Sequence, residues 1–414
     1  MNVKVFQFNG CNKCFYETIL LKKESKVELE LIRNPKEWSE EKIDVAIITG
    51  YILPDEKDIL NKIESNANKV IAFGDCTTTG GIYGLANQKG HNITPIHKFS
   101  PDSILINGCL AEVEELKFEI SGEERLNLKS LCKVCKRRST CDYLDEVKRQ
   151  IDPFEDEETC FNDIGFLCSG YIATECKERC IDYGTQCRGC KPMVKRPGIR
   201  MLGMFGTLMG NIEVATEASE YGATDKLADE DDDVTDSLPD IIGNFFRFTL
   251  PTSGLPKGRI TSRGTVLEDI FIGRLIEELP LITGLLGGNK SISMTLSLIE
   301  AYEEGAGIAI SDKTKKYRED LRLLESKLQE AIEGQDTLKY EEVTNNIRKI
   351  AGNMNLSNLF FGGFKTLISG DDNFNEYKSH IFDVIEGSYK NGIIEFSIDS
   401  KGVITDIKIK EGNV

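Results

Sequence analysis

The chain is poor in several residue types and patterns that would point to common functions. Its 414 residues include only 3 histidines, and no apolar run approaches the about 20 residues that a membrane-spanning helix requires. The first residues show neither a basic and then apolar segment nor a pair of arginines, so no export signal is visible. The formal net charge of −17 argues against nucleic acid as a partner, because that affinity comes largely from lysine and arginine. We expect a cytoplasmic protein with no membrane span.

Cysteine is absent from the second half of the chain. All 13 cysteines lie between Cys11 and Cys190. An odd number of thiols in a reducing compartment argues against a disulfide scaffold. Because histidine is so rare, sulfur would have to supply most ligands of any metal site. This favours iron–sulfur clusters or all-cysteine zinc sites.

Four of the cysteines follow predicted strands in the first 110 residues, in the strings "FNGCNKC", "FGDC" and "INGC". The first string alone would also allow a redox-active disulfide. The carboxyl ends of parallel strands meet at one edge of a sheet, so we expect Cys11, Cys14, Cys76 and Cys109 to converge there. The apolar runs predict strands at 3–8, 27–34, 44–52, 69–73 and 103–107, with helices at 17–26 and 55–68.

The other nine cysteines lie in a segment with little periodic pattern, residues 131–192. They are Cys132, Cys135, Cys141, Cys160, Cys168, Cys176, Cys180, Cys187 and Cys190. Such a segment is expected to fold around the metal that it binds. Eight ligands would hold two four-cysteine sites and leave one cysteine over. Both zinc and iron–sulfur clusters fit this spacing, and the run C-x-x-C-x-x-C of bacterial ferredoxins is absent.

The rest of the chain carries no catalytic constellation, so a partner-binding or structural role is expected for it. An acidic run at 225–240 predicts a solvated loop. The apolar stretch at 241–251 would be either core or a docking segment. Further on, the patterns predict an amphipathic helix at 266–279, a helical hairpin at 311–334 and 339–350, and a β-hairpin at 392–412.

Three strings of the first half, taken together, resemble a known family. "GCNKC", "AFGDCTTTGGIYGLANQ" and "INGCLAEVEEL" are similar to the small subunit of cytoplasmic nickel–iron hydrogenases, of the archaeal methyl-viologen-reducing and deazaflavin-reducing type. The string "CFNDIGFLCSGYIATECKERCIDYGTQCRGCKP" resembles the cysteine-rich part of those subunits, and "LADEDDDVTDSLPDIIGNFFRF" resembles their closing segment. The similarity covers residues 2–255, and the tail has no counterpart.

This resemblance implies a fold and a set of cofactors. The fold would be α/β, with a flavodoxin-like parallel-sheet domain at 1–125, a cysteine-rich irregular iron–sulfur domain at 126–258 and an α+β extension at 259–414. Cys11, Cys14, Cys76 and Cys109 would hold the proximal [4Fe-4S] cluster. The positions matching the medial and distal [4Fe-4S] clusters are Cys132, Cys135, Cys160, Cys168, Cys176, Cys180, Cys187 and Cys190. The resemblance does not divide these eight between the two clusters, and Cys141 has no counterpart.

The implied function is that of an oxidoreductase subunit without catalytic residues of its own. Hydrogen would be split at a Ni-Fe centre on a separate hydrogenase large subunit, and electrons would pass through three [4Fe-4S] clusters to an acceptor, a flavoprotein or an iron–sulfur subunit. An iron–sulfur electron conduit of a non-hydrogenase oxidoreductase complex is the alternative, and a binding module with structural zinc is a third possibility. The alternative is motivated by the added tail and by two departures from the family pattern, Asp75 and the string "LAEV" after Cys109. A further departure places Glu17 one position late.

Two further expectations concern the surroundings of the clusters. Backbone N–H groups at Gly80 and Gly81 would suit hydrogen bonds to cluster sulfur, which is one of the means by which a protein tunes a cluster. Four basic side chains stand among the cysteines of the second segment and are expected to be solvated. They are Lys133, Lys136, Arg137 and Arg138.

Overall fold

The computed structural model describes residues 1–24, 26–123, 128–139, 147–152, 158–178, 180–192, 240–255, 264–365, 386–390 and 394–409. Cys141 and the acidic run up to residue 239 lie outside these residues. Both expected domain boundaries, after residues 125 and 258, also fall outside them and stay predictions. No helix among the described residues is long and apolar enough to cross a membrane.

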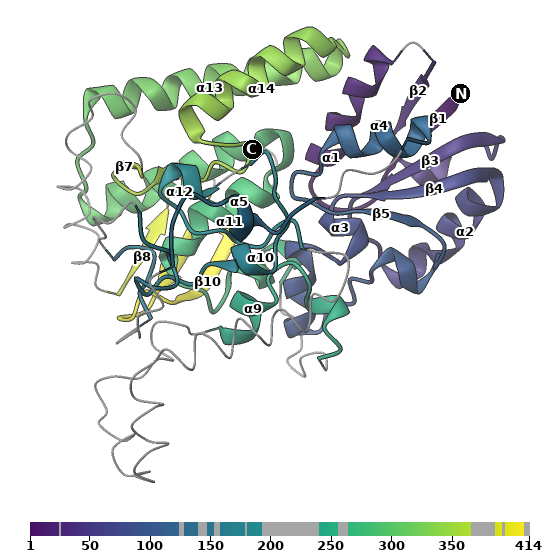
Figure 1. Cartoon of the computed structure of the whole chain (residues 1–414). Coiled ribbons are helices and arrows are strands. Elements are labelled where there is room, and N and C mark those ends of the chain that lie inside the picture. Colours follow the sequence, from purple (N-terminus) through teal and green to yellow (C-terminus); the bar gives the residue numbers. More distant parts are fainter. Residues whose placement is uncertain are drawn as a thin grey trace.

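A five-stranded parallel sheet forms the N-terminal part of the molecule, in purple and blue in Figure 1. Its strands are β1 (Asn2–Gln7), β2 (Glu28–Ile32), β3 (Ile43–Thr49), β4 (Ala67–Phe73) and β5 (Ile104–Ile106). They pair in the order β2-β1-β3-β4-β5, which is the flavodoxin-like order. The predicted strands and the α/β fold class of this region are confirmed. The strand order reverses direction between β1 and β3, and ligands bind outside the carboxyl edge at such a point.

Helices cover both faces of this sheet. On one face α2 (Lys57–Asn66) packs Leu60 and Ile63 against apolar side chains of β1 and β3. On the other face lie α1 (Lys13–Glu17), which continues as a 3-10 turn over Thr18–Lys23, and α4 (Val113–Ser121). The helix expected at 17–26 therefore begins earlier, at Lys13, and places Cys14 on a helix.

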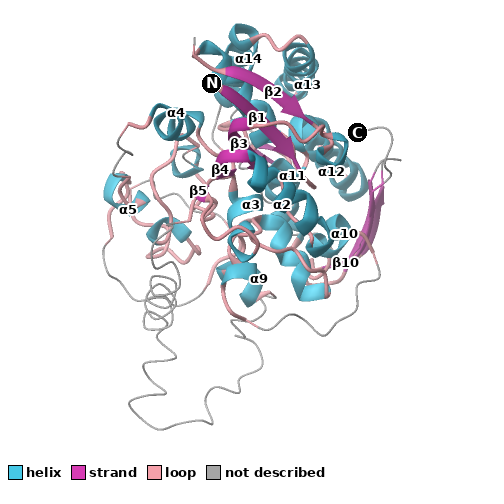
Figure 2. Ribbon diagram, turned by 90° about the vertical axis from the view of Figure 1, so that its right-hand side faces the viewer, coloured by secondary structure: helices cyan, strands magenta, loops and turns pink. Residues whose placement is uncertain are grey.

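The C-terminal segment, residues 264–365, packs against the same core as the sheet. Its buried apolar side chains and those of β1, β3 and β4 form one continuous cluster. Figure 1 shows its green helices next to α1 and the purple sheet, and Figure 2 shows the helices and the sheet from the side. The elements are α10 (Val266–Phe271), α11 (Leu279–Leu286), α12 (Ser291–Ala306), α13 (Asp312–Glu333), α14 (Thr337–Ala351), β6 (Leu359–Phe360) and β7 (Gly363–Phe364).

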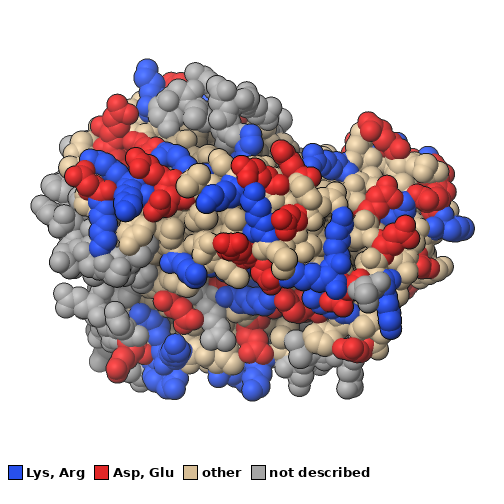
Figure 3. Space-filling view, turned by 90° about the horizontal axis from the view of Figure 1, so that it is seen from above, with Lys and Arg blue, Asp and Glu red and all other residues tan. Residues whose placement is uncertain are grey.

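A three-stranded antiparallel sheet follows, with β8 (Gly387–Lys390), β9 (Ile394–Ile398) and β10 (Ile404–Ile409) in the order β10-β9-β8. The predicted helical hairpin, α13 with α14, and the predicted β-hairpin, β9 with β10, are confirmed. On the face seen from above, which includes this helical hairpin, acidic and basic side chains are interspersed (Figure 3).

The single helix expected over 266–279 is wrong. The helix α10 ends at Phe271, and Gly273 takes a left-handed backbone conformation with φ of 90°. From there the backbone turns to pair with the β9–β10 hairpin: Gly273 N donates to Ile404 O at 2.9 Å, and Ile404 N donates to Arg274 O at 2.8 Å. These bonds to a distant hairpin replace the helical ones, so a second helix begins only at Leu279.

Two ion pairs join α12 to α13, and their burial differs sharply. Arg318 is 1% exposed and donates through both terminal nitrogens to Glu303, at 2.6 and 2.7 Å. Gly362 N donates to the same carboxylate at 2.6 Å. One turn away, Arg322 pairs with Glu300 at 2.6 Å, but the two side chains are 41% and 36% exposed.

We predict that Arg318→Met lowers the free energy of unfolding by about 3–5 kcal/mol, because Glu303 would be left as a buried charge without its partner. The matched change Arg322→Met should cost about 1 kcal/mol or less, since exposed ion pairs contribute little. Urea denaturation of the full chain measures both. Equal losses in the two variants would contradict the assigned burial.

Candidate metal centres

The structure brings Cys11, Cys14, Cys76 and Cys109 together at the carboxyl edge of the parallel sheet, as the strand-end pattern predicted. Cys11 follows β1, Cys14 lies in α1, Cys76 lies in the short helix α3 (Asp75–Thr78) after β4, and Cys109 follows β5. Burial raises the pKa of the Cys76 and Cys109 thiols well above the usual value, and the other cysteines of the group raise it further. We call this group the first site.

Glycine at the end of β4 is required by this convergence. Gly74 has φ of 101°, and a Cβ there would lie 2.7 Å from Cys14 Sγ. The structure does not give Gly80 and Gly81 the expected hydrogen bonds to cysteine sulfur. Gly81 N donates to Thr79 Oγ1 at 3.4 Å, so this N–H faces a hydroxyl and no cysteine, while Gly80 packs closely against Pro251.

Asp75 links two ligand-bearing loops of the first site. Its Oδ1 accepts a hydrogen bond from Gly108 N at 2.7 Å, and its own N–H donates to Gly108 O at 3.1 Å. Its other carboxylate oxygen finds no partner among the described residues. Burial raises the pKa of Asp75 well above its usual range, although the Gly108 hydrogen bond opposes this. The side chain that departs from the family pattern therefore fastens Cys76 to Cys109.

The other eight candidate cysteines separate into two groups. The second site comprises Cys176, Cys180, Cys187 and Cys190, and the third site comprises Cys132, Cys135, Cys160 and Cys168. After burial, the charges that raise the pKa of Cys190 are those of Cys180, Cys176 and Cys187 and that of Cys109 in the neighbouring first site. Cys187 lies next to the third site, because Cys168, with Cys180 and Cys176, raises its pKa. Burial raises the pKa of Cys132 to about 11, and the charges of Cys160 and Cys135 raise it as well. The sequence pattern had not divided these eight residues.

The three sites lie in a row. Cys109 N, in the first site, donates to Cys190 O, in the second, at 2.8 Å. Cys187 N, in the second, donates to Cys168 Sγ, in the third, at 3.3 Å. Cys132 of the third site is exposed, whereas three of the four cysteines of the second site are buried. The second site is therefore the most buried of the three, and the third site reaches the protein surface at Cys132.

The donor sets fit [4Fe-4S] clusters. Each site offers four thiols and no imidazole, which is the usual ligand set of such a cluster. Within the described residues, no group of three or more histidine, cysteine or acidic side chains is arranged to hold a single metal ion.

A buried cation between the second and third sites supports this fit. Arg188 is 8% exposed, and its Nε and Nη2 atoms have no hydrogen-bond partner in the described part of the chain. Burial lowers its pKa to about 10, against the attraction of Glu278 and of Cys180 and Cys168 from the two neighbouring sites. A guanidinium with unused donors at this position suits an anionic group held by the thiolates.

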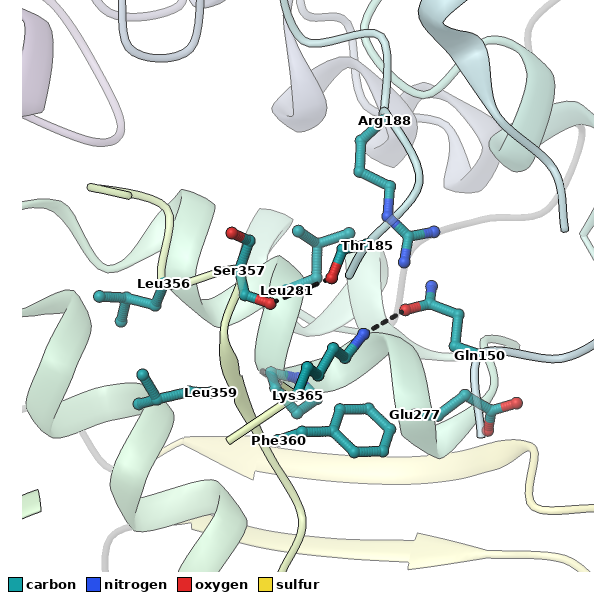
Figure 4. A pocket seen from close by; sticks show the side chains of 11 residues that line it. Gln150, Thr185, Arg188, Glu277, Leu281, Leu356, Ser357, Leu359, Phe360 and Lys365 are labelled. Atoms are coloured by element: carbon teal, nitrogen blue, oxygen red, sulfur yellow. Dashed lines mark hydrogen bonds between the residues drawn. The ribbon is translucent and has the colours of Figure 1, made fainter. Parts of the chain in front are cut away.

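Arg188 also lines a small pocket beside the second site (Figure 4). Gln150, Thr185, Ser357 and Lys365 reach it from separate segments, and Lys365 Nζ donates to Gln150 Oε1 at 3.4 Å. About 10 Å³ of it is open to the centre of a water molecule, so it admits a single small species.

The basic side chains near the third site are not all solvated. Arg137 is partly buried, stacks 3.9 Å from the centre of the Phe161 ring and donates to Thr159 O at 2.6 Å. The expectation of a solvated side chain is therefore wrong for Arg137, because its guanidinium braces the loop that carries Cys160. Lys133, Lys136 and Arg138 are exposed, as expected.

The C-terminal segment contacts the first site, which nothing in the sequence predicted. Lys13 Nζ donates to Gly284 O at 2.6 Å and to Met354 O. The backbone of Gly288 lowers the pKa of the Cys11 thiol, and Asn355 Nδ2 donates to Cys109 O. These partners are separated by more than 200 residues in the chain, and their residue types alone carry no metal-site signal.

Glu17 lies under the same segment and is 8% exposed. Tyr340 of α14 donates its hydroxyl to Glu17 Oε2 at 2.9 Å. Burial raises the pKa of Glu17 to about 7, although Arg348 and the Tyr340 hydrogen bond oppose the shift. In the folded chain this carboxyl therefore holds a proton over a pH range in which an unfolded glutamate would be ionised.

We predict that Glu17→Gln makes the folded chain less sensitive to pH. A carboxyl whose pKa rises on folding stabilises the fold below its unfolded pKa of 4.5, and that contribution is lost as pH rises to about 7. The variant should gain up to about 3 kcal/mol over the wild type between pH 4.5 and pH 7. Urea denaturation at pH 4.5, 6 and 7.5 tests this, with Glu319→Gln on the exposed side of α13 as the control. A constant difference across these pH values would contradict the prediction.

Comparisons with known proteins relate the chain to oxidoreductase subunits. Residues 6–118 match the family model described as NADH ubiquinone oxidoreductase, 20 kDa subunit. A subunit of the F420-non-reducing hydrogenase of Methanothermobacter marburgensis is 26% identical over 299 residues, covering 60% of this chain and 93% of the relative. The iron-sulfur subunit of the F420-non-reducing hydrogenase of Archaeoglobus profundus is 24% identical over 238 residues, covering 43% and 74%.

Among solved structures, a chain of an NAD+-reducing [NiFe]-hydrogenase in the H2-reduced state is 17% identical. The match covers 30% of this chain and 94% of the hydrogenase chain, and the TM-score of 0.27 is low. The family match and the related subunits confirm the resemblance seen in the cysteine strings. This chain is thus similar to hydrogenase subunits, an oxidoreductase subunit type, and has an additional C-terminal region.

Proposed function

We propose that this chain is the iron–sulfur electron-transfer subunit of a cytoplasmic nickel–iron hydrogenase and carries three [4Fe-4S] clusters. The observation that carries the proposal is the row of three four-cysteine sites, from the first site at the sheet edge to the exposed Cys132. The name of the Archaeoglobus relative, which includes the words iron-sulfur subunit, supports the cofactor class. All twelve of these cysteines would be ligands.

The proposed clusters supply one-electron transfer when they are bound. The chain's own residues hold them at fixed positions, limit their contact with water and provide the local charges. Arg188 between the second and third sites offers positive charge to both. Gly74, Asp75 and Gly108 fix the first site by close backbone approach.

The proposed partners lie at the two ends of the row. A hydrogenase large subunit with the Ni-Fe centre would exchange electrons with the first site. An acceptor protein, a flavoprotein or an iron–sulfur subunit, would dock near the third site, where Cys132 and the side chains of Lys133 and Lys136 are exposed.

One observation favours the second candidate, an iron–sulfur conduit of a non-hydrogenase oxidoreductase complex. The C-terminal segment contacts Asn12, Lys13 and Cys109, and so occupies one side of the site through which the large subunit's electrons would enter. In this alternative the three clusters remain and the partner with the Ni-Fe centre is replaced.

Anaerobic purification with metal and sulfide analysis tests the proposal. We expect about twelve iron per chain, from three four-iron clusters, and one nickel per copurifying large subunit. Twelve iron without a nickel-containing partner would select the second candidate. Bound zinc without iron would contradict both, and about four iron would mean that the cysteine-rich segment holds no clusters.

Paired cysteine substitutions test the division into sites. Cys176→Ala with Cys187→Ala removes two ligands of one site and should lower the iron content by about four per chain. Cys132→Ala with Cys187→Ala removes one ligand from each of two sites and should lower the iron content by about eight per chain. Cys141→Ala, outside the proposed ligand set, is the control and should keep the full iron content. Equal losses in the two double variants would contradict the assignment.

A further inference from the structure

Asn353, in the loop between α14 and β6, reaches the second site from the C-terminal segment. It is 1% exposed, and its Nδ2 donates to Cys180 Sγ at 3.5 Å. This hydrogen bond opposes the rise that burial causes in the pKa of the Cys180 thiol. A buried side-chain amide thus stabilises negative charge on one sulfur of the second site.

The orientation of this amide is fixed by its other end. Asn353 Oδ1 accepts hydrogen bonds from Asn355 N at 3.0 Å and from Ser357 N at 3.1 Å. Two backbone donors require an oxygen at that position, so the NH₂ group has to face the sulfur. The loop is therefore folded around a single arrangement of the Asn353 side chain.

Further contacts fasten the same loop to the second site. Glu178, between Cys176 and Cys180 in the sequence, accepts from Arg348 Nε at 2.9 Å and from Met354 N at 2.7 Å. Thr185 Oγ1 donates to Ser357 O at 3.3 Å. Because both sides of the loop are anchored on the ligand-bearing backbone, the amide and the sulfur keep their separation.

The physical effect of such a donor on a redox centre has a definite sign. Reduction adds one negative charge to a cluster and its thiolates, so a donor to sulfur stabilises the reduced form more than the oxidised form. In a buried site the interaction is stronger than in water. The Asn353 hydrogen bond therefore raises the reduction potential of whatever cluster Cys180 holds.

We propose that Asn353 is a potential-setting residue of the second site, and that the C-terminal segment serves as an internal module that tunes the electron path. The inference rests on the proposed function, because it requires a cluster at that site. With clusters bound, one electron would pass from the first site to the second and on to the third, with no bond made or broken.

The test is a redox titration, followed by electron paramagnetic resonance, of the full chain purified without oxygen. Asn353→Ser keeps an oxygen that can accept from the loop backbone, but it is too short to reach Cys180. We expect one of three midpoint potentials to become more negative while the other two stay unchanged. Asn358→Ser is the matched control, because the Asn358 amide is equally buried and donates to Ile350 O. It should shift none of the three.

A second variant tests the hydrogen bond in another way. Asn353→Asp keeps the shape and both backbone bonds, and places a titratable oxygen against Cys180. The midpoint of that one cluster should then depend on pH more steeply than in the wild type. A purely structural residue would not cause this.

The outcomes separate the inference from the function on which it rests. A wild-type chain without iron contradicts the proposed function. A full set of clusters with wild-type midpoints in both Asn353 variants overturns the role of Asn353 and leaves the function standing. Equal shifts in Asn353→Ser and Asn358→Ser, or loss of the second site's iron in both Asn353 variants, would show a structural role and also overturn it.

Discussion

The gathering of thiols into buried groups is the constraint on which the rest of this structure depends. In each site the charges of neighbouring cysteines oppose ionisation, and burial opposes it further. Thiolates can coexist there only with a positively charged metal group and with nearby donors. Three surrounding residues contribute to this. Gly74 leaves space because it has no side chain, Asp75 joins two ligand-bearing loops by a hydrogen bond, and Arg188 places positive charge between two sites.

The C-terminal segment is also part of the surroundings of these cysteine groups. It shares the hydrophobic core of the sheet, and its loops place backbone carbonyls on Lys13 and the Asn353 amide on cysteine sulfur. Its contacts place this added region beside the candidate metal sites, whereas the sequence predicted only an unspecific partner-binding or structural role. The chain thus supplies from its own tail a cover for the first site.

The sequence predicted those features that follow from local pattern. Near-continuous apolar runs located β3 and β4, and the rule that ligands gather at the carboxyl ends of parallel strands placed Cys11, Cys14, Cys76 and Cys109 together. The division of the other eight cysteines could not be predicted, because they lie on irregular loops whose course has no period. The Asn353–Cys180 contact spans 173 residues and depends on how a helical hairpin packs. The prediction of a helix beyond Phe271 was wrong for the same reason, because the backbone groups of that segment form hydrogen bonds with a distant β-hairpin.

The position of the covering segment has a consequence for how the protein is made. The four cysteines of the first site are complete once residue 109 has been synthesised, while the loops that cover them, around Gly288 and Asn355, are made much later. At about 5–20 residues per second, roughly ten to fifty seconds separate the two events. During translation the four thiols of the first site are therefore complete before the residues that contact them from the tail exist, and the side of the site that the tail later occupies is open until the tail folds.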